Sequence, residues 1–155
     1  MESCTERFFV MAHQLPGLWQ GLLSDRVIRP LDLSTWQLLQ QHVIPALGAV
    51  VLSPDHLGNL YGLSGSHVAH SIGRLRKALL VATWKDPRTK QRMLVLNPHV
   101  SSMGNSQRRG WIWARFCEAT DGRAAAVFTE QALAAWAIDE ATRDASRLDN
   151  GSAPM

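Results

Sequence analysis

Residues 53–79 have the sequence SPDHLGNLYGLSGSHVAHSIGRLRKAL, and this stretch decides the fold. Its first three residues are typical of a helix N-terminus. Ser53 can cap the first free N–H groups, Pro54 fits the first helical position, and Asp55 faces the positive end of the helix dipole. Gly62 is placed to end this helix, because glycine tolerates the left-handed backbone conformation that follows a last turn. The pattern predicts a short helix that stops before Gly62.

A second helix is expected almost immediately after the first. Ser64 is its N-cap candidate, and apolar side chains then recur at spacings of four, three and four residues, which is one helical face: Val68, Ile72, Leu75 and Leu79. In the first helix, Leu57 and Leu60 supply the buried side, and the small Gly58 allows the two helices to pack closely. The pattern therefore predicts a helix-turn-helix.

The chain changes period after this helix pair. Residues 80–84 and 92–96 are mainly apolar and predict two strands, and the polar segment between them contains the turn-forming pair Asp86-Pro87. The second strand is closed by Asn97-Pro98. A basic β-hairpin is therefore expected directly after the second helix.

Further elements are expected before this unit. Helical spacing predicts short helices over 18–24 and 31–42, the second capped by Asp32 or Ser34. A short strand near 49–52 and a strand or packed arm over 7–10 complete the N-terminal part.

The C-terminal part is expected to hold a second hairpin and a helix. The turn signal Asp121-Gly122 predicts a hairpin over 111–127, although three consecutive alanines at 124–126 favour a helix. A helix is expected over 128–146 with Thr129 as its cap, with Leu133, Trp136 and Ala137 on one face.

Positive charge is concentrated in the middle of the chain. The formal net charge is only +3, but residues 61–115 hold ten lysines and arginines against the single acid Asp86. Residues 1–60 hold three cations and five acids, and residues 116–155 hold three cations and seven acids. Because phosphate binding requires cations on one surface, this distribution favours a nucleic-acid partner over an unevenly charged solvated surface.

The second helix offers polar side chains opposite its apolar face. A rotation of about 100° per residue also turns Gly73 outward, where it would let DNA approach closely unless it is only a tolerated helix glycine. Serine and histidine bind phosphates or bases, and arginine holds guanine through two hydrogen bonds. The candidate DNA-binding residues of this recognition helix are Ser64, Ser66, His67, His70, Arg74 and Lys77.

The hairpin adds four cations within eight residues: Lys85, Arg88, Lys90 and Arg92. Alternation along the strands places some of them toward solvent, where they can follow the DNA backbone or enter the minor groove. Lysines on an exposed hairpin also serve simply to prevent edge-to-edge aggregation. Their place just after a helix-turn-helix favours the DNA-binding interpretation.

From about residue 31 to 104, the order of elements resembles a winged helix. More narrowly, the chain resembles plasmid replication initiators of the RepL type. The resemblance rests on the helix-turn-helix at 53–79, the hairpin ending Val95-Leu96-Asn97-Pro98, the following Gly104 and the aromatic segment 111–116. It implies binding to origin DNA and recruitment of host replication proteins.

The expected fold class is therefore α+β, mainly α: a winged helix-turn-helix with N-terminal helices and a C-terminal helix. We expect residues 1–104 to form a DNA-binding domain with an N-terminal helical extension. Residues 105–147 would be a C-terminal appendage that packs or dimerises, and residues 148–155 a disordered tail.

Signals for catalysis, metal binding and membrane insertion are weak. There is no Gly-x-x-x-x-Gly-Lys-Ser/Thr loop, and packing explains the only tyrosine, Tyr61, better than catalysis does. His67 and His70 lack a third metal ligand nearby, and Cys4 and Cys117 form no disulfide framework. No apolar run reaches the roughly 18 residues of a membrane span. We expect a cytoplasmic protein that is not an enzyme and needs no cofactor.

Three functions share these features. The first is initiation of plasmid replication through sequence-specific binding of double-stranded DNA at an origin. The second is transcriptional regulation, as a repressor of the winged-helix type. The third is a winged helix that binds an acidic protein partner. A homodimer, through the helix over 128–146 or the N-terminal helices, fits the first two, since such proteins often bind paired half-sites.

Overall fold

Up to residue 98, helices and strands follow one another in the predicted order. The computed structural model describes residues 15–101 and 106–137. The expected arm over 7–10, the end of the helix over 128–146 and the tail over 148–155 lie outside these residues. Every helix within the described ranges is too short or too polar to span a lipid bilayer. The elements are α2 (Pro16–Ser24), α3 (Pro30–His42), β1 (Ala49–Val50), α4 (Pro54–Tyr61), α5 (Gly65–Lys77), β2 (Val81–Lys85), β3 (Arg92–Leu96), α6 (Ser106–Ala119) and α7 (Arg123–Val127).

The three strands form one antiparallel sheet in the order β1-β3-β2. β2 and β3 pair along their full length, from Val81 opposite Leu96 to Lys85 opposite Arg92. β1 adds to the other edge of β3 through Ala49, which is paired with Val95. The hairpin expected between residues 80 and 96 is confirmed.

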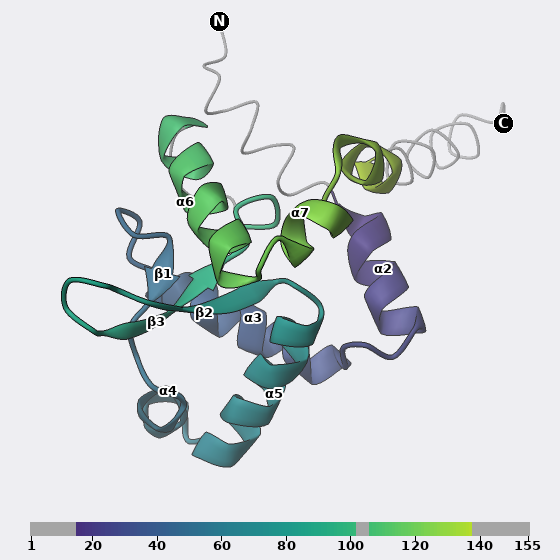
Figure 1. The fold of residues 1–155 in the computed structure, drawn as a ribbon. Helices are drawn as coiled ribbons and strands as arrows, with labels where there is room; N and C mark the ends of the chain where they lie inside the picture. Colours follow the sequence, from purple (N-terminus) through teal and green to yellow (C-terminus); the bar gives the residue numbers. More distant parts are fainter. Residues whose placement is uncertain (1–14, 102–105, 138–155) are drawn as a thin grey trace, which may run out of the picture.

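Helices cover both faces of this sheet, which gives three layers (Figure 1). Side chains alternate between the two faces of a strand. Leu94 and Leu96 belong to the apolar cluster that the sheet forms with α2, α3 and α5. Met93 and Val95 belong to a second cluster, formed with α6 and α7. β3 is therefore buried on both sides, and its consecutive apolar residues serve two cores.

The chain after residue 105 is helical, so the expected hairpin over 111–127 is wrong. α6 packs against β2 and β3, and its Ile112 and Phe116 are 2% and 0% exposed. Asp121 and Gly122 form the expected turn, with left-handed φ values of 53° and 79°, but they connect two helices instead of two strands. Residues of α6 and α7 thus pack on the sheet and form part of the second apolar cluster.

A further helical segment over 130–137 follows α7. The Thr129 hydroxyl accepts a hydrogen bond from the Ala132 N–H at 3.1 Å, which confirms Thr129 as the cap. Leu133 and Trp136 are half-buried against the cluster that includes α2. This segment therefore packs against the first apolar cluster, where the Trp136 ring contacts that of Phe128.

A buried carboxylate ties α5 to α3. Asp32, in the first turn of α3, is fully buried and accepts hydrogen bonds from the Arg29 N–H at 2.8 Å and the Ser71 hydroxyl at 2.5 Å. The Arg74 guanidinium donates two more, from Nε at 2.8 Å and Nη2 at 2.9 Å. The Thr35 hydroxyl lies 2.7 Å from that of Ser71. Asp32 is the third residue of α3 and not its expected N-cap, which is Arg29, but its carboxylate completes a capping box there and also holds α5 in place.

The Asp32 carboxyl is ionised because its partners outweigh its burial. Burial alone would raise its pKa, but the hydrogen bonds from Arg74, Ser71 and the Arg29 backbone bring the pKa below its usual value of 3.8. A depressed folded-state pKa stabilises the fold at pH values above the unfolded pKa. This stabilisation is lost as pH falls through the folded-state pKa.

We predict that Asp32→Asn lowers the free energy of unfolding at neutral pH by about 3 kcal/mol, because it leaves the Arg74 charge without its partner in a site that is only partly open to solvent. Urea denaturation measures this change. The loss should shrink as pH falls below 3.8, where the carboxyl takes up a proton first in the unfolded chain and, at lower pH, in the folded protein. Asp25→Asn, at an exposed position, is the control and should leave stability within about 0.5 kcal/mol. Equal stability of the Asp32 variant would contradict the role of this ion pair.

Candidate nucleic-acid interface

α4 and α5 are built by the capping signals in their sequence. The Ser53 hydroxyl accepts a hydrogen bond from the His56 N–H at 3.1 Å, and Gly62 ends α4 with a φ of 68°. Ser64 occupies the N-cap position of α5, but its side chain makes no capping hydrogen bond. Both predicted helix boundaries are confirmed, and the exposed Ser64 hydroxyl is not used to hold the helix.

Close backbone packing joins the two helices. A Cβ atom on Gly58 would lie 2.6 Å from the Leu63 carbonyl oxygen, so only glycine fits this position without a shift of the turn. Leu57 is buried, as expected, but Leu60 is 53% exposed and the expectation that it would be buried is wrong. The buried side of α4 is centred between Leu57 and Gly58, and Leu60 lies about 110° away from that centre on the helix.

The expected apolar face of α5 is confirmed for three of its four residues; the fourth, Leu79, is buried but lies beyond the end of the helix, with a φ of 60°. Val68, Ile72 and Leu75 are 3%, 2% and 0% exposed. On the opposite side, the exposed residues include four of the predicted DNA-binding side chains: Ser66, His67, His70 and Lys77. The structure thus presents one polar face of α5 to solvent. The helix itself lies at the lower end of the molecule in Figure 1.

Arg74 does not belong to this exposed face, which corrects the sequence-based expectation. Its guanidinium forms the ion pair with Asp32 on α3, and its side chain is 24% exposed. Arg74 follows Ser71 by three residues, which places it about 60° from that buried position and within reach of α3. The signal in the sequence was Asp32 itself, the only acid between residues 26 and 54.

The ten cations of residues 61–115 divide into two groups. Besides Arg74, three lie on α6, where Arg108 is half-buried. Arg109 is buried and donates to the Pro98 carbonyl oxygen, and burial lowers its pKa to about 10. Arg115 lies between two tryptophan rings, 4.0 Å from the centre of Trp84 and 3.7 Å from that of Trp111. The other six are exposed and lie on α5 and the hairpin: Arg76, Lys77, Lys85, Arg88, Lys90 and Arg92.

Like charges face each other on the hairpin. Lys85 and Arg92 are direct cross-strand partners, on the side of the sheet that faces α5. Two cations in this position destabilise an isolated sheet. The only acid of the hairpin, Asp86, accepts a hydrogen bond from the Arg88 N–H at 2.8 Å, and this bond keeps its pKa below the usual range. Asp86 therefore shapes the hairpin loop, and the cation pair lacks a matching acid on either strand.

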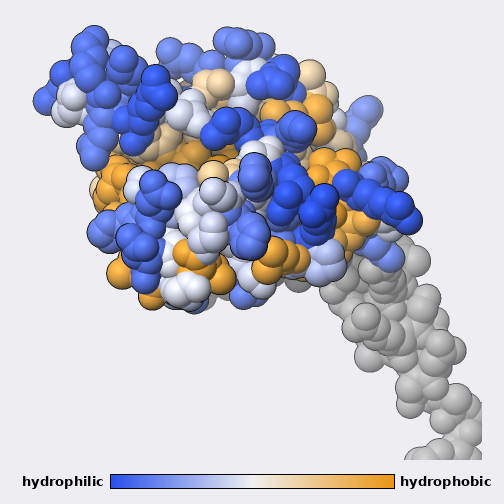
Figure 2. Space-filling view, turned by 90° about the horizontal axis from the view of Figure 1, so that it is seen from below, coloured by the Kyte–Doolittle hydropathy of each residue, from blue (hydrophilic) through white to orange (hydrophobic). Residues whose placement is uncertain are grey.

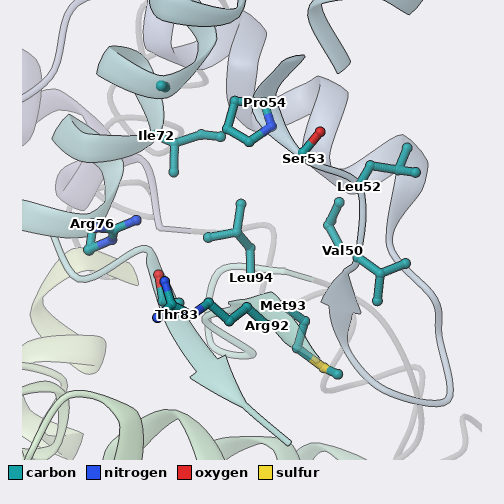
Figure 3. A pocket seen from close by; sticks show the side chains of 12 residues that line it. Val50, Leu52, Ser53, Pro54, Ile72, Arg76, Thr83, Arg92, Met93 and Leu94 are labelled. Atoms are coloured by element: carbon teal, nitrogen blue, oxygen red, sulfur yellow. The ribbon is translucent and has the colours of Figure 1, made fainter. Parts of the chain in front are cut away.

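A cavity of about 300 Å³ lies between α5, the start of α4 and the sheet (Figure 3). Its walls are mainly apolar, and Arg76 and Arg92 reach it from α5 and β3. Sequence reasoning missed Arg76, because it stands four residues after the buried Ile72 and so close to the apolar face. In the structure that flank of α5 borders the cavity, and Arg76 remains exposed.

The surface on the side of α4 and α5 is mostly hydrophilic (Figure 2). Hydrophobic side chains appear there as separate patches between polar ones. Exposed hydrophobic residues of this helix pair are Leu60, Tyr61 and Leu63. The Tyr61 hydroxyl donates a hydrogen bond to the side-chain oxygen Oε1 of Gln41 at 3.2 Å and lies 2.7 Å from Nε2 of His42, which gives this tyrosine a structural contact to α3.

The Asn97-Pro98 pair has a structural role. Asn97 is fully buried, and its amide nitrogen donates to the Leu79 carbonyl oxygen at 3.0 Å. Its backbone N–H donates to the Leu80 carbonyl oxygen at 2.9 Å. These bonds fasten the end of β3 to the segment between α5 and β2. The motif thus explains how the hairpin is set against α5, and does not itself offer a group for binding.

No protein-family model matches this chain, and neither a curated protein nor a solved structure matches it significantly.

Two glycines of the helix pair provide a matched prediction. Nothing lies within 4 Å of a Cβ added at Gly73, so Gly73→Ala should stabilise the protein by about 0.5–1 kcal/mol through helix propensity. Gly58→Ala should instead destabilise it by about 1–3 kcal/mol, because the new methyl group meets backbone. Thermal unfolding of both variants checks the assignment. Stabilisation by both changes would contradict the close packing of Gly58 against the turn that follows α4.

Proposed function

We propose that this chain binds double-stranded DNA, with α5 in the major groove and the β2–β3 hairpin along the phosphate backbone. The observation that supports the proposal best is the division of the cations. Six exposed lysines and arginines lie on α5 and the hairpin, where Asp86 is the only acid. A surface of this kind attracts a polyanion. A bound phosphate would also reduce the repulsion between the cross-strand partners Lys85 and Arg92.

The order of elements supports a winged-helix interpretation. One helix, a short strand, two helices and a hairpin follow one another, and the short strand pairs with the second strand of the hairpin. In this interpretation α5 is the recognition helix and the hairpin is the wing. Because one fold serves many functions, the proposal rests on the charged surface and uses the fold only to orient it.

The exposed residues take different roles in this proposal. Ser66, His70 and Lys77 lie on the outward face of α5 and are placed to contact base edges or nearby phosphates, with Ser64 and His67 at its first turns. Arg74 becomes a positioning residue, because it is bound to Asp32. The phosphate contacts are assigned to Arg76, Lys85, Arg88, Lys90 and Arg92.

Within DNA binding, we propose initiation of plasmid replication as the biological role. This part follows from the resemblance to RepL-type initiators, and it would place the protein in the cytoplasm with origin DNA and host replication proteins as partners. A transcriptional repressor would use the same surface on an operator. A protein–protein module would use it on an acidic partner.

We predict binding to duplex DNA that weakens as salt increases, with the slope of log affinity against log salt changing by about 0.9 for each phosphate contact. The double variant Arg88→Gln/Lys90→Gln should make this slope shallower by about 2 for any duplex sequence. Fluorescence anisotropy of a labelled duplex, measured across a salt series, tests this. Arg123→Gln removes an exposed cation on α7, on the other side of the sheet, and should leave the slope unchanged.

Two results would contradict the proposal. The first is the absence of binding to any duplex at low salt, which would leave only the protein-partner function. The second is an equal loss in the Arg123 variant, which would show that net charge matters and the hairpin does not.

The role in replication is tested by the DNA that the protein selects. When fragments of its own plasmid or genome are presented in equal amounts, an initiator should recover a cluster of repeats at a replication origin. A repressor should recover an operator upstream of an operon. A homodimer on paired half-sites would show repeats about 10–10.5 base pairs apart, centre to centre, and a dimeric mass in sedimentation with DNA. Recovery of operator fragments only would overturn the initiator role.

A further inference from the structure

We propose that the cavity between α5 and the sheet binds a small organic carboxylate with an apolar body. The cavity holds about 300 Å³, which is at the lower end of the range for small-molecule sites. This site is independent of DNA binding, since it is defined by the cavity and two arginines alone.

The walls of the cavity favour a ligand that has an apolar part. Val50, Leu52, Ile72 and Leu94 line it from β1, the following loop, α5 and β3 (Figure 3). An inorganic anion would leave the accessible apolar surface of Leu52, Pro54 and Ala69, which also line the cavity, against water. A hydrocarbon ring or short chain removes this surface from water when it binds. The walls therefore favour an organic ligand over free phosphate.

The charged groups of the cavity favour a ligand with negative charge. Arg76 and Arg92 line the same cavity from α5 and β3 (Figure 3), and no aspartate or glutamate lines it. Within the part of the chain that the structure describes, the guanidinium groups of both arginines make no hydrogen bond or ion pair. The hydroxyl groups of Ser53 and Thr83 add polar atoms to the same lining. Two guanidinium groups beside an apolar wall match a carboxylate, which each can hold through charge-assisted hydrogen bonds.

Occupation of the cavity has a consequence that rests on the proposed DNA binding. Arg76 and Arg92 are two of the six exposed cations on α5 and the hairpin. A carboxylate bound to them neutralises part of the surface that phosphate would contact. The ligand should therefore weaken DNA binding, as an effector of a regulated protein does.

Naphthalene-2-carboxylate is a suitable probe, because it joins one carboxylate to a compact apolar body. Isothermal titration of the full chain, without DNA, should give a Kd below about 1 mM. The uncharged 2-naphthalenemethanol should bind with an affinity at least about tenfold lower, because it lacks the charge that the arginines recognise. Inorganic phosphate should bind more weakly than the carboxylate, because it gains nothing from the apolar walls.

Variants separate the charge of the site from its volume. Arg76→Gln and Arg92→Gln should each weaken naphthalene-2-carboxylate binding by about tenfold and leave binding of the alcohol unchanged. Ala69→Leu fills the cavity from α5, where Ala69 lines it and is exposed to solvent. It should weaken binding of both compounds without unfolding the protein. Lys77→Gln removes a neighbouring charge that does not line the cavity and is the control.

The outcomes distinguish this proposal from DNA binding. Equal affinity for the carboxylate and the alcohol, or unchanged affinity in both arginine variants, overturns the site. Binding of phosphate as strong as that of the carboxylate overturns the organic ligand. Carboxylate binding by a chain that fails to bind DNA supports the site and contradicts the proposed function. Carboxylate binding that leaves DNA affinity unchanged overturns the effector role alone.

Discussion

The carboxylate of Asp32 is fully buried, and an ion in that position needs a partner. Arg74 supplies the partner from α5, and Ser71 adds a hydroxyl from the helical turn before it. Because two residues of α5 are bound to one carboxylate on α3, the rotation of α5 about its axis is fixed. That rotation decides which side chains of α5 face solvent. The polar face proposed for DNA and the arginine that borders the cavity are both consequences of it.

The ion pair between Asp32 and Arg74 also illustrates why the number of charges in a segment is an incomplete guide to a binding surface. Ten cations lie between residues 61 and 115, but Arg74 holds α5 in place, Arg109 is buried against Pro98, and Arg115 lies between two tryptophans. What remains exposed is concentrated on α5 and the hairpin. Two arginines of that group also border an apolar cavity. The DNA-binding surface and the carboxylate site that we propose would therefore share these two arginines.

Much of the fold could be predicted from local patterns. The capping signals at Ser53 and Gly62, the apolar spacing of α5 and the hairpin were all confirmed. The segment over 111–127 could not be, because its turn signal at Asp121-Gly122 fits a helix–helix connection as well as a hairpin. The burial of β3 on both faces was visible in the consecutive apolar residues 93–96, which do not alternate. Burial of the second face of β3 requires a further layer of helices, which α6 provides.

By itself, the sequence determined both ends of α4, the start of α5, the apolar face that holds α5 against the core and the hairpin that follows it. These features depend on residues three or four positions apart in a helix, or on the turn that connects two adjacent strands. Short-range sequence patterns are therefore enough to predict them. Only the tertiary structure decided the partner of Arg74 and the place of Arg76, as well as the packing of α6 onto the sheet. Those outcomes depend on groups far apart along the chain, such as Asp32 and Arg74, that meet only when the helices pack.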